Sequence, residues 1–295
     1  MLHQRLHQPL ADTVLYHYCS ADTLLAILQS KSIRMSDANM MNDYAEGRYG
    51  YGVFEEAASE ILKDELTQKV FPDFNVEFFD KVDEVVSGLQ LSLHPVIASF
   101  SKKPDVLSQW FRYADRGRGF ALGLDANILL DMPATLVEIE YDRAIQINEA
   151  RETLAGIFMR NKTESLNYGR AFRDDCAVFA TMLLSFKSSG FREEEEVRLI
   201  HLLDVTNDDD RPRLKDEGGI VRKRKVKGQQ VEYRVTDGAF IAYIDLPFPP
   251  KSEKSLAKQI WFGPKNENAF GNVLYFASEN RWKVGAFHNS EVTFR

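Results

Sequence analysis

Cysteine is scarce in this sequence, and no cysteine or histidine residues stand at metal-ligand spacing. Cys19 and Cys176 are the two cysteines among 295 residues, and they lie far apart. This usage is typical of a reducing compartment and argues against a disulfide framework. The six histidines are also scattered, so the sequence predicts no zinc site or other metal centre.

Long hydrophobic runs are missing as well. The longest, at residues 177–186, reaches about half of the ~20 residues that a membrane-spanning helix needs. Residues 1–13 contain no continuous apolar stretch after their basic residues, so we expect no secretory signal. Together these absences predict a soluble protein located in the cytoplasm.

The sequence also lacks an excess of positive charge and a glycine-rich phosphate-binding motif. The chain has 37 Lys and Arg residues against 44 Asp and Glu, a net charge of −7. A dedicated duplex-DNA binder needs a broad cationic surface, which this balance does not favour. No GxGxxG motif stands between a predicted strand and helix, and no P-loop occurs, so a Rossmann-type dinucleotide domain is not expected.

What the sequence does contain is enough apolar surface for a packed core. Apolar residues make up 44% of the chain and aromatic residues 12%, which excludes disorder for most of it. Hydrophobic periodicity predicts strands at 14–20, 32–38, 95–101, 118–125, 135–142 and through much of the chain from 194, and helices at 21–31, 51–71, 76–89, 105–115, 145–186 and 266–280. This order predicts an α+β fold and a single domain over residues 1–295, with an insertion or long hairpin at 204–235.

Four consecutive glutamates, Glu193 to Glu196, directly precede the apolar segment VRLI. Residues two apart on a strand share a face, so we expect Glu194, Glu196 and Arg198 to point the same way. Two stacked carboxylates can perform acid–base chemistry or bind hydroxyl groups. Their repulsion raises the pKa of one of them unless Arg198 or a ligand compensates. A solvated strand entrance is the alternative interpretation.

Two further segments carry polar side chains beside predicted strands. His17 lies between two tyrosines on the strand at 14–20, where a hydrogen-bonded core histidine is the alternative to a functional one. The segment 108–125 predicts an amphipathic helix that is buried through Trp110. Gly117 and Gly119 then permit the turn into the next strand.

The segment 222–234 is the one strongly basic stretch. Its cations are Arg222, Lys223, Arg224, Lys225 and Lys227. Such residues beside a strand commonly discourage edge-to-edge pairing. The functional alternative is an acceptor surface for RNA or single-stranded nucleic acid, although only Tyr233 lies nearby for base stacking.

In order along the chain, the blocks at 15–43, 96–125 and 191–200, together with IWFGP at 260–264, resemble a bacterial family known as domain of unknown function 2971. That family is similar to the ADP-ribosyltransferase superfamily. The resemblance implies a split, mixed β core with flanking helices that binds NAD in a cleft. Val197 departs from the Trp that is usual in the family, and Cys19 from a Thr or Ser.

The resemblance also implies where the site residues lie. Glu196 matches the catalytic glutamate of a late strand, with Glu194 two residues before it. A glutamine at Glu196 is then expected to abolish transfer and leave the fold intact. The NAD-binding residues that the resemblance implies are His17, Tyr18, Ser20, Ser36, Asn42, Ser99, Gln109 and Tyr113. Tyr18 and Tyr113 are both candidates for stacking on nicotinamide, and Tyr44 and Tyr113 for the superfamily's tyrosine.

The implied activity is mono-ADP-ribosyl transfer from NAD to a protein or nucleic-acid acceptor, with no metal. A toxin or phage-defence effector would have this activity, together with an antitoxin or immunity partner. Two alternatives stay open. One is an NAD glycohydrolase that uses water as the acceptor, and the other is an inactive module that binds NAD or another nucleotide for regulation.

Overall fold

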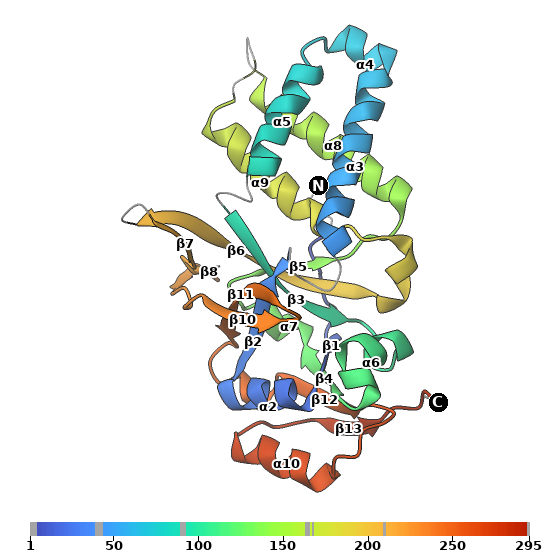
Figure 1. The fold of residues 1–295 in the computed structure, drawn as a ribbon, viewed down its shortest axis with the longest axis vertical. Helices are drawn as coiled ribbons and strands as arrows, with labels where there is room; N and C mark the ends of the chain where they lie inside the picture. The colour runs from blue at the N-terminus through green and yellow to red at the C-terminus, as the bar shows by residue number, and fades with distance from the viewer. Residues whose placement is uncertain are drawn as a thin grey trace.

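The computed structural model describes residues 5–38, 44–88, 93–162, 166, 168–208 and 211–293. It is a mixed α+β structure in which one large sheet is flanked by helices (Figure 1). The predicted α+β class is therefore confirmed. Within the described ranges, no helix combines the length and the apolar character needed to cross a membrane.

The helices and strands follow one another in the order that Figure 1 labels. The α-helices are α2 (Ala21–Ser30), α3 (Tyr44–Lys63), α4 (Glu65–Val70), α5 (Val76–Gly88), α6 (Leu107–Tyr113), α7 (Ala126–Leu129), α8 (Arg143–Asn161), α9 (Arg170–Leu183) and α10 (Phe270–Glu279). The strands are β1 (Val14–Cys19), β2 (Ser32–Asp37), β3 (Leu93–Ser101), β4 (Phe120–Asp125), β5 (Thr135–Glu138), β6 (Glu196–Asp208), β7 (Arg211–Lys215), β8 (Gly219–Val221), β9 (Arg224–Val226), β10 (Glu232–Thr236), β11 (Ala239–Pro247), β12 (Ala257–Phe262) and β13 (Ala286–Asn289).

In the large sheet, the central strand β3 pairs only over short stretches with β1 and β2. Its strands run in the order β10-β11-β2-β3-β1-β4-β12-β13, and β6 pairs with β3, β5 and β7. The β12–β13 pair is parallel and the other strand pairs among the described residues are antiparallel, so the sheet is mixed. β3 pairs with β6 along its whole length, but with β1 only at Tyr16↔Ser101 and with β2 only at its Val96–Ile97 end. β1 and β2 therefore diverge from β3.

Helix α2 joins β1 to β2, and local sequence features explain where it begins and ends. Ser20 caps its first turn, because its side-chain oxygen accepts a hydrogen bond from the Thr23 N–H at 3.2 Å. Lys31 ends it in the left-handed conformation. Leu24 and Leu28 are buried on the face that packs against the sheet. The opposite face is left to line the opening between the strands.

Two hydrophobic cores support this arrangement. One lies under the sheet and includes Ile33, Leu122 and Ile260. The other lies among α3, α5, α8 and α9 and is built around Phe78 and Phe158. Figure 1 shows these four helices gathered at one end of the molecule, with the sheet at the other. The single-domain organisation stays a prediction.

Several predicted elements have other bounds in the structure; the helix predicted at 51–71, for example, is divided between α3 and α4. The strand predicted at 135–142 ends at Glu138, because Asp142 instead caps α8 by accepting hydrogen bonds from the Ala144 and Ile145 N–H groups. The helical stretch predicted at 145–186 is two helices, α8 and α9. Within the region where an insertion or long hairpin was predicted, at 204–235, residues 204–208 continue β6, which forms a hairpin with β7.

Candidate functional site

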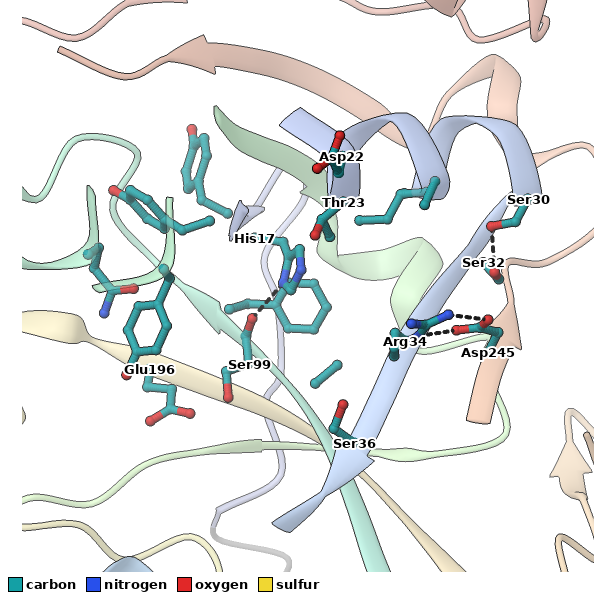
Figure 2. A pocket seen from close by; sticks show the side chains of 18 of the residues that line it. His17, Asp22, Thr23, Ser30, Ser32, Arg34, Ser36, Ser99, Glu196 and Asp245 are labelled. Carbon is teal, nitrogen blue, oxygen red and sulfur yellow. Dashed lines mark hydrogen bonds and ion pairs between the residues drawn. The ribbon is translucent and has the colours of Figure 1, made fainter. Parts of the chain in front are cut away.

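A cavity of about 660 Å³ opens where β1 and β2 diverge from β3, and α2 forms one of its walls. This volume lies within the range of small-molecule sites. Figure 2 shows Glu196 toward one side of it, His17 and Ser99 near its middle, and Arg34 with Asp245 toward the other side. The cavity therefore has chemically different ends.

Most of the predicted site residues line this one cavity. They are His17, Tyr18, Ser36, Ser99, Gln109, Tyr113, Glu194 and Glu196. Ser20 is not among the lining residues, because its side chain caps α2. Asn42 lies outside the residues that the structure describes, as does the side chain of Tyr44.

The two glutamates come together by a different route from the predicted one. Glu194 is not on the strand: it ends a 3₁₀ helix (Ser189–Glu194), and β6 begins at Glu196. Glu195 between them has a φ of 41°, and this left-handed residue turns the chain. Glu195 consequently points outward to Lys103 at 2.7 Å, whereas Glu194 and Glu196 are 2% and 6% exposed.

Lys187 joins the two buried carboxylates, and sequence reasoning did not identify it. Its Nζ lies 2.7 Å from Glu194 Oε2 and 3.1 Å from Glu196 Oε2, and its side chain is 3% exposed. The one available sequence signal was its position as a lysine directly after the apolar run at 177–186. A buried lysine is expected to have an acidic partner.

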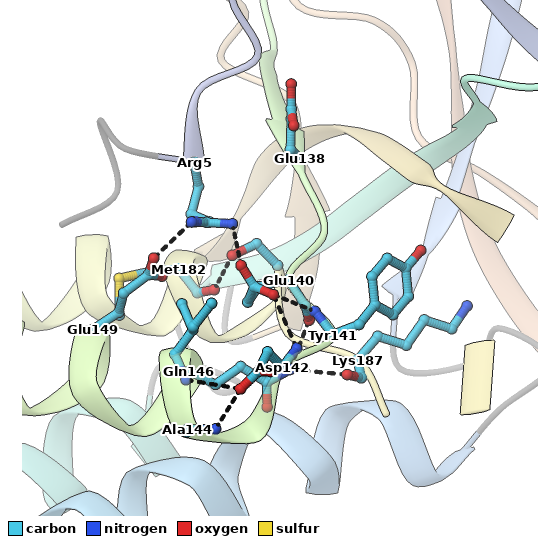
Figure 3. Close-up of polar contacts among 12 residues, drawn as sticks. Arg5, Glu138, Glu140, Tyr141, Asp142, Ala144, Gln146, Glu149, Met182 and Lys187 are labelled. Atoms are coloured by element: carbon cyan, nitrogen blue, oxygen red, sulfur yellow. Dashed lines mark hydrogen bonds and ion pairs between the residues drawn. The ribbon is translucent and has the colours of Figure 1, made fainter. Parts of the chain in front are cut away.

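A backbone network holds this part of the site in place (Figure 3). The Lys187 N–H donates to the Glu140 carbonyl at 3.0 Å. The Gln146 side chain donates to the carbonyl groups of Glu140 and Lys187 at 2.6 and 2.9 Å. The Glu196 N–H donates to the Tyr141 hydroxyl at 2.9 Å. The first turn of α8 thereby fixes the segment from which Lys187 reaches the glutamates.

Arg198 contacts Glu196 and lowers the pKa of that carboxyl group. Its Nε and Nη2 donate to the two Glu196 oxygens at 2.6 and 2.9 Å. Burial alone would raise the pKa of Glu196, but Arg198 and then Lys187 outweigh burial and hold this pKa at about 2. Both Glu196 oxygens are thus engaged by cations.

Glu194 has the opposite character. Burial raises its pKa above the usual range, and Lys187 offsets this rise only in part. Its second oxygen faces the half-exposed Arg112 at 3.4 Å, a long contact that keeps acceptor capacity for a ligand. The site therefore places a firmly ionised carboxylate beside one with a higher proton affinity. Glu194 has one close cation contact, to Lys187, and one long contact, to Arg112, whereas both Glu196 oxygens lie close to a cation.

His17 is a neutral hydrogen-bonding group on the cavity wall. Its Nδ1 lies 3.0 Å from the Ser99 carbonyl, which can only accept, so Nδ1 carries a proton. Burial lowers the pKa of His17, which favours the neutral ring at pH 7. In that tautomer Nε2 is an acceptor for a ligand hydroxyl.

Both candidate stacking tyrosines, Tyr18 and Tyr113, line the cavity. The Tyr18 hydroxyl donates to the Lys103 carbonyl and accepts from the Val106 N–H, each at 3.0 Å. Its ring also packs edge-on against Trp110, with centroids 4.8 Å apart. Tyr113 follows on α6 and lines the cavity. Tyr18 therefore supports the cavity wall through these contacts, and Tyr113 packs beside the same aromatic cluster.

The five predicted cations of the basic segment, at 222–227, lie away from the cavity, whereas Arg234 at its end lines it. β8 and β9 form a separate two-stranded hairpin, with Arg222 and Lys223 at its turn. Arg222 pairs with Asp131 at 2.7 Å. None of the five predicted cations lines the cavity. Their role as an acceptor surface stays a prediction.

We also looked at whether side chains in the described part of the chain could bind a metal ion. No group of three or more His, Cys, Asp or Glu side chains there is arranged to hold an ion. The acidic pair instead has Lys187 and Arg198 as its cations.

Comparison with known proteins gives one match. A family model described as a protein of unknown function (DUF2971) matches residues 109–199. This stretch runs from Gln109 on the cavity wall through Lys187 and both buried glutamates. No curated protein and no solved structure matches the chain. This match supports the resemblance to the DUF2971 family that the sequence motifs predicted.

Proposed function

We propose that the cavity binds NAD and that the protein transfers ADP-ribose from it to a protein or nucleic-acid acceptor. The observation that carries this proposal is the meeting of His17 with the buried Glu194 and Glu196 around one cavity. The implied superfamily has a split, mixed β core, and the divergence of β1 and β2 from β3 supports that likeness. A cavity of about 660 Å³ has room for a ligand of this class.

Cleavage of the bond between nicotinamide and ribose develops positive charge on the sugar, as in glycoside hydrolysis. In the proposed site Glu196 stays ionised beside this charge, since its pKa is about 2. Lys187 and Arg198 offset part of its field, so its main effect is to fix where the other groups point. His17 Nε2 accepts a hydrogen bond from a ribose hydroxyl, and Tyr113 stacks on nicotinamide.

Glu194 takes the proton of the incoming acceptor group in this proposal. Its raised pKa suits it to general base catalysis, which contributes typically about 10²–10⁴-fold to a rate. This assignment moves the reacting carboxylate from Glu196, which the family motif implied, to Glu194. The reason is that both Glu196 oxygens are already engaged by Arg198.

A substitution series tests the proposal through NAD consumption. Glu194→Gln should lower the rate by about a hundredfold or more, because it removes the base while keeping the shape of the side chain. Glu195→Gln is the matched control, since it belongs to the same glutamate run but faces Lys103 outside the cavity. Consumption of NAD by Glu194→Gln at the rate of the control would remove Glu194 from the mechanism.

One observation favours a second candidate, an inactive module that binds NAD or another nucleotide. The carboxylates of Glu194 and Glu196 are matched by the cations of Lys187 and Arg198, an arrangement that structural ion-pair networks also have. Such a module would be stabilised by NAD, by ~2.7 kcal/mol at a hundredfold excess over the dissociation constant, without turnover. A glycohydrolase would instead release free ADP-ribose and label no acceptor.

A further inference from the structure

Two arginines line the part of the cavity that holds Asp245. Arg34 comes from β2 and Arg234 from β10, and β11 lies between these strands in the sheet. Arg34 pairs in register with Asp245, and Ser36 pairs with Tyr243. Alternation along β2 therefore places Arg34 and Ser36 on the same face of the sheet. The proposed transfer chemistry uses neither arginine.

Arg34 is already ordered. Its Nε and Nη2 donate to the two Asp245 oxygens at 2.8 and 2.9 Å (Figure 2). Its guanidinium carbon also lies 3.8 Å from the centroid of the Tyr243 ring. These contacts use two of the five N–H groups of a guanidinium. Because the side chain is fixed in advance, it loses little conformational freedom when the other N–H groups bind a ligand.

Arg234 is a cation without an acidic partner at ion-pair distance among the described residues. Its Nη2 donates a hydrogen bond to Ser36 Oγ at 3.3 Å. Burial, and then repulsion from Arg34, lower the pKa of Arg234, but an arginine stays protonated at neutral pH. A second guanidinium thus lies close to the first with most of its donors unused.

Two acidic groups beside the arginines, Asp245 and Glu232, are engaged by other side chains, and Asp22 lines the cavity next to Thr23. Asp245 is held by Arg34, and Glu232 accepts a hydrogen bond from the Tyr243 hydroxyl at 2.6 Å. Hydroxyl groups complete the lining of this side of the cavity: Thr23, Ser30, Ser32 and Ser36. Such hydroxyls donate readily to anionic oxygens.

We propose that Arg34 and Arg234 form a subsite for the diphosphate of a nucleotide, with the neighbouring serine hydroxyls as further donors. Guanidinium forks match the geometry of phosphate oxygens. Two such forks from different strands favour a group that carries charge on two linked phosphates over a single carboxylate. The subsite stands on its own geometry. Only its consequence for NAD, whose nicotinamide end would then face Glu194, rests on the proposed function.

Calorimetric titration of the purified chain with ADP, inorganic pyrophosphate and adenosine tests the subsite. ADP and pyrophosphate should bind, and adenosine should bind at least about tenfold more weakly than ADP, because it lacks the anion. Arg234→Gln should weaken ADP and pyrophosphate binding by about tenfold or more, and Arg234→Lys should restore part of the loss. Added salt should weaken binding to the wild type.

Arg213→Gln is the matched control. Arg213 is an exposed arginine on β7 that does not line the cavity, so its loss should leave ADP binding unchanged. Arg234 is itself on the exposed strand β10, where a substitution is expected to be tolerated in folding. Circular dichroism of each variant checks that expectation.

Two results would overturn the subsite: no pyrophosphate binding by the wild type, or equal ADP binding by the wild type and Arg234→Gln. NAD turnover is measured separately, so that the two proposals can fail independently. If ADP binds through Arg234 and NAD is not consumed, the subsite stands and the transfer fails. If Arg234→Gln binds ADP normally and NAD is consumed, the transfer stands and the subsite fails.

Discussion

Lys187 determines how the two buried glutamates can coexist. Without it, two carboxylates would face each other in a nearly water-free environment, where like charges repel strongly. With Lys187 and Arg198 present, the cluster contains two anions and two cations in mutual contact. Because of these contacts, a substitution that removes the charge of Glu196 also removes its ion pairs with Lys187 and Arg198.

Glu196→Gln is therefore expected to destabilise the protein, by about 3–5 kcal/mol, because it leaves buried cations without their partner. This revises the expectation that the variant would keep the fold intact. Urea denaturation measures the change, and Glu195→Gln, which loses only a surface pair, should cost less than about 1 kcal/mol. Equal stability of the two variants would contradict the ion-pair network.

The pKa of Glu196 predicts how the stability of the protein changes at low pH. The pKa of Glu196 is about 2 in the folded protein, below the value of 4.5 for an unpaired glutamate. A lowered pKa contributes stability above about pH 4.5 that is lost as the pH falls toward 2. Urea midpoints measured between pH 6 and pH 3 should fall for the wild type and fall less steeply for Glu196→Gln. Parallel curves for the two proteins would contradict this assignment.

At the scale of elements, the sequence predicted what depends on local patterns. The strand, capped helix and strand at 14–38 are such a case, since Ser20 and the apolar stripe of α2 act within one or two turns. The interpretation of Gly117 and Gly119 as turn residues is confirmed. Gly117 has a φ of +89°, and a Cβ on Gly119 would lie 2.1 Å from the Cys19 carbonyl oxygen.

What the sequence could not predict depends on contacts between distant segments. Arg34 and Arg234 meet only because β2 and β10 lie around one cavity, and Lys187 reaches the glutamates of that cavity from the segment after α9. Strand alternation led us to expect Glu194 and Glu196 on the same face, but a left-handed residue between them is what brings them together. Periodicity cannot reveal such a turn, because a glutamate is not a residue that favours it.

The β8–β9 hairpin leads to a prediction about the acceptor. Neutralising Lys223, Arg224, Lys225 and Lys227 together should reduce the labelling of a nucleic-acid acceptor, because backbone contacts to phosphates depend on such charges. NAD consumption should stay unchanged, since none of these residues lines the cavity. Labelling that responds neither to this change nor to added salt would leave the hairpin without an acceptor role.

At the scale of the whole molecule, the cavity lies beside the junction of the two hydrophobic cores. Arg5 contacts Glu140 at 2.9 Å and Glu149 at 2.7 Å (Figure 3). The Tyr49 hydroxyl donates to Gln146 at 2.9 Å, within the network that holds Lys187. These contacts join α3 and α8 to the segment that leads to the glutamates, so the two cores are expected to unfold together.

A comparison of two spectroscopic signals tests this expectation. The three tryptophans, Trp110, Trp261 and Trp282, all pack with the sheet, so their fluorescence reports on that part. Far-ultraviolet circular dichroism at the helical band reports mainly on the helices, of which the longest are α3 and α8. Coincident urea transitions would support the single-domain prediction, and two separated midpoints would contradict it.

The most direct test of the central claim is incubation with NAD labelled on its adenylate phosphate and a cell extract as the source of acceptors. The account predicts label on a macromolecule with the wild type and with Glu195→Gln, and none with folded Glu194→Gln. If the wild type neither labels an acceptor nor consumes NAD, the central claim is wrong. Label that persists with Glu194→Gln would contradict the role given to Glu194.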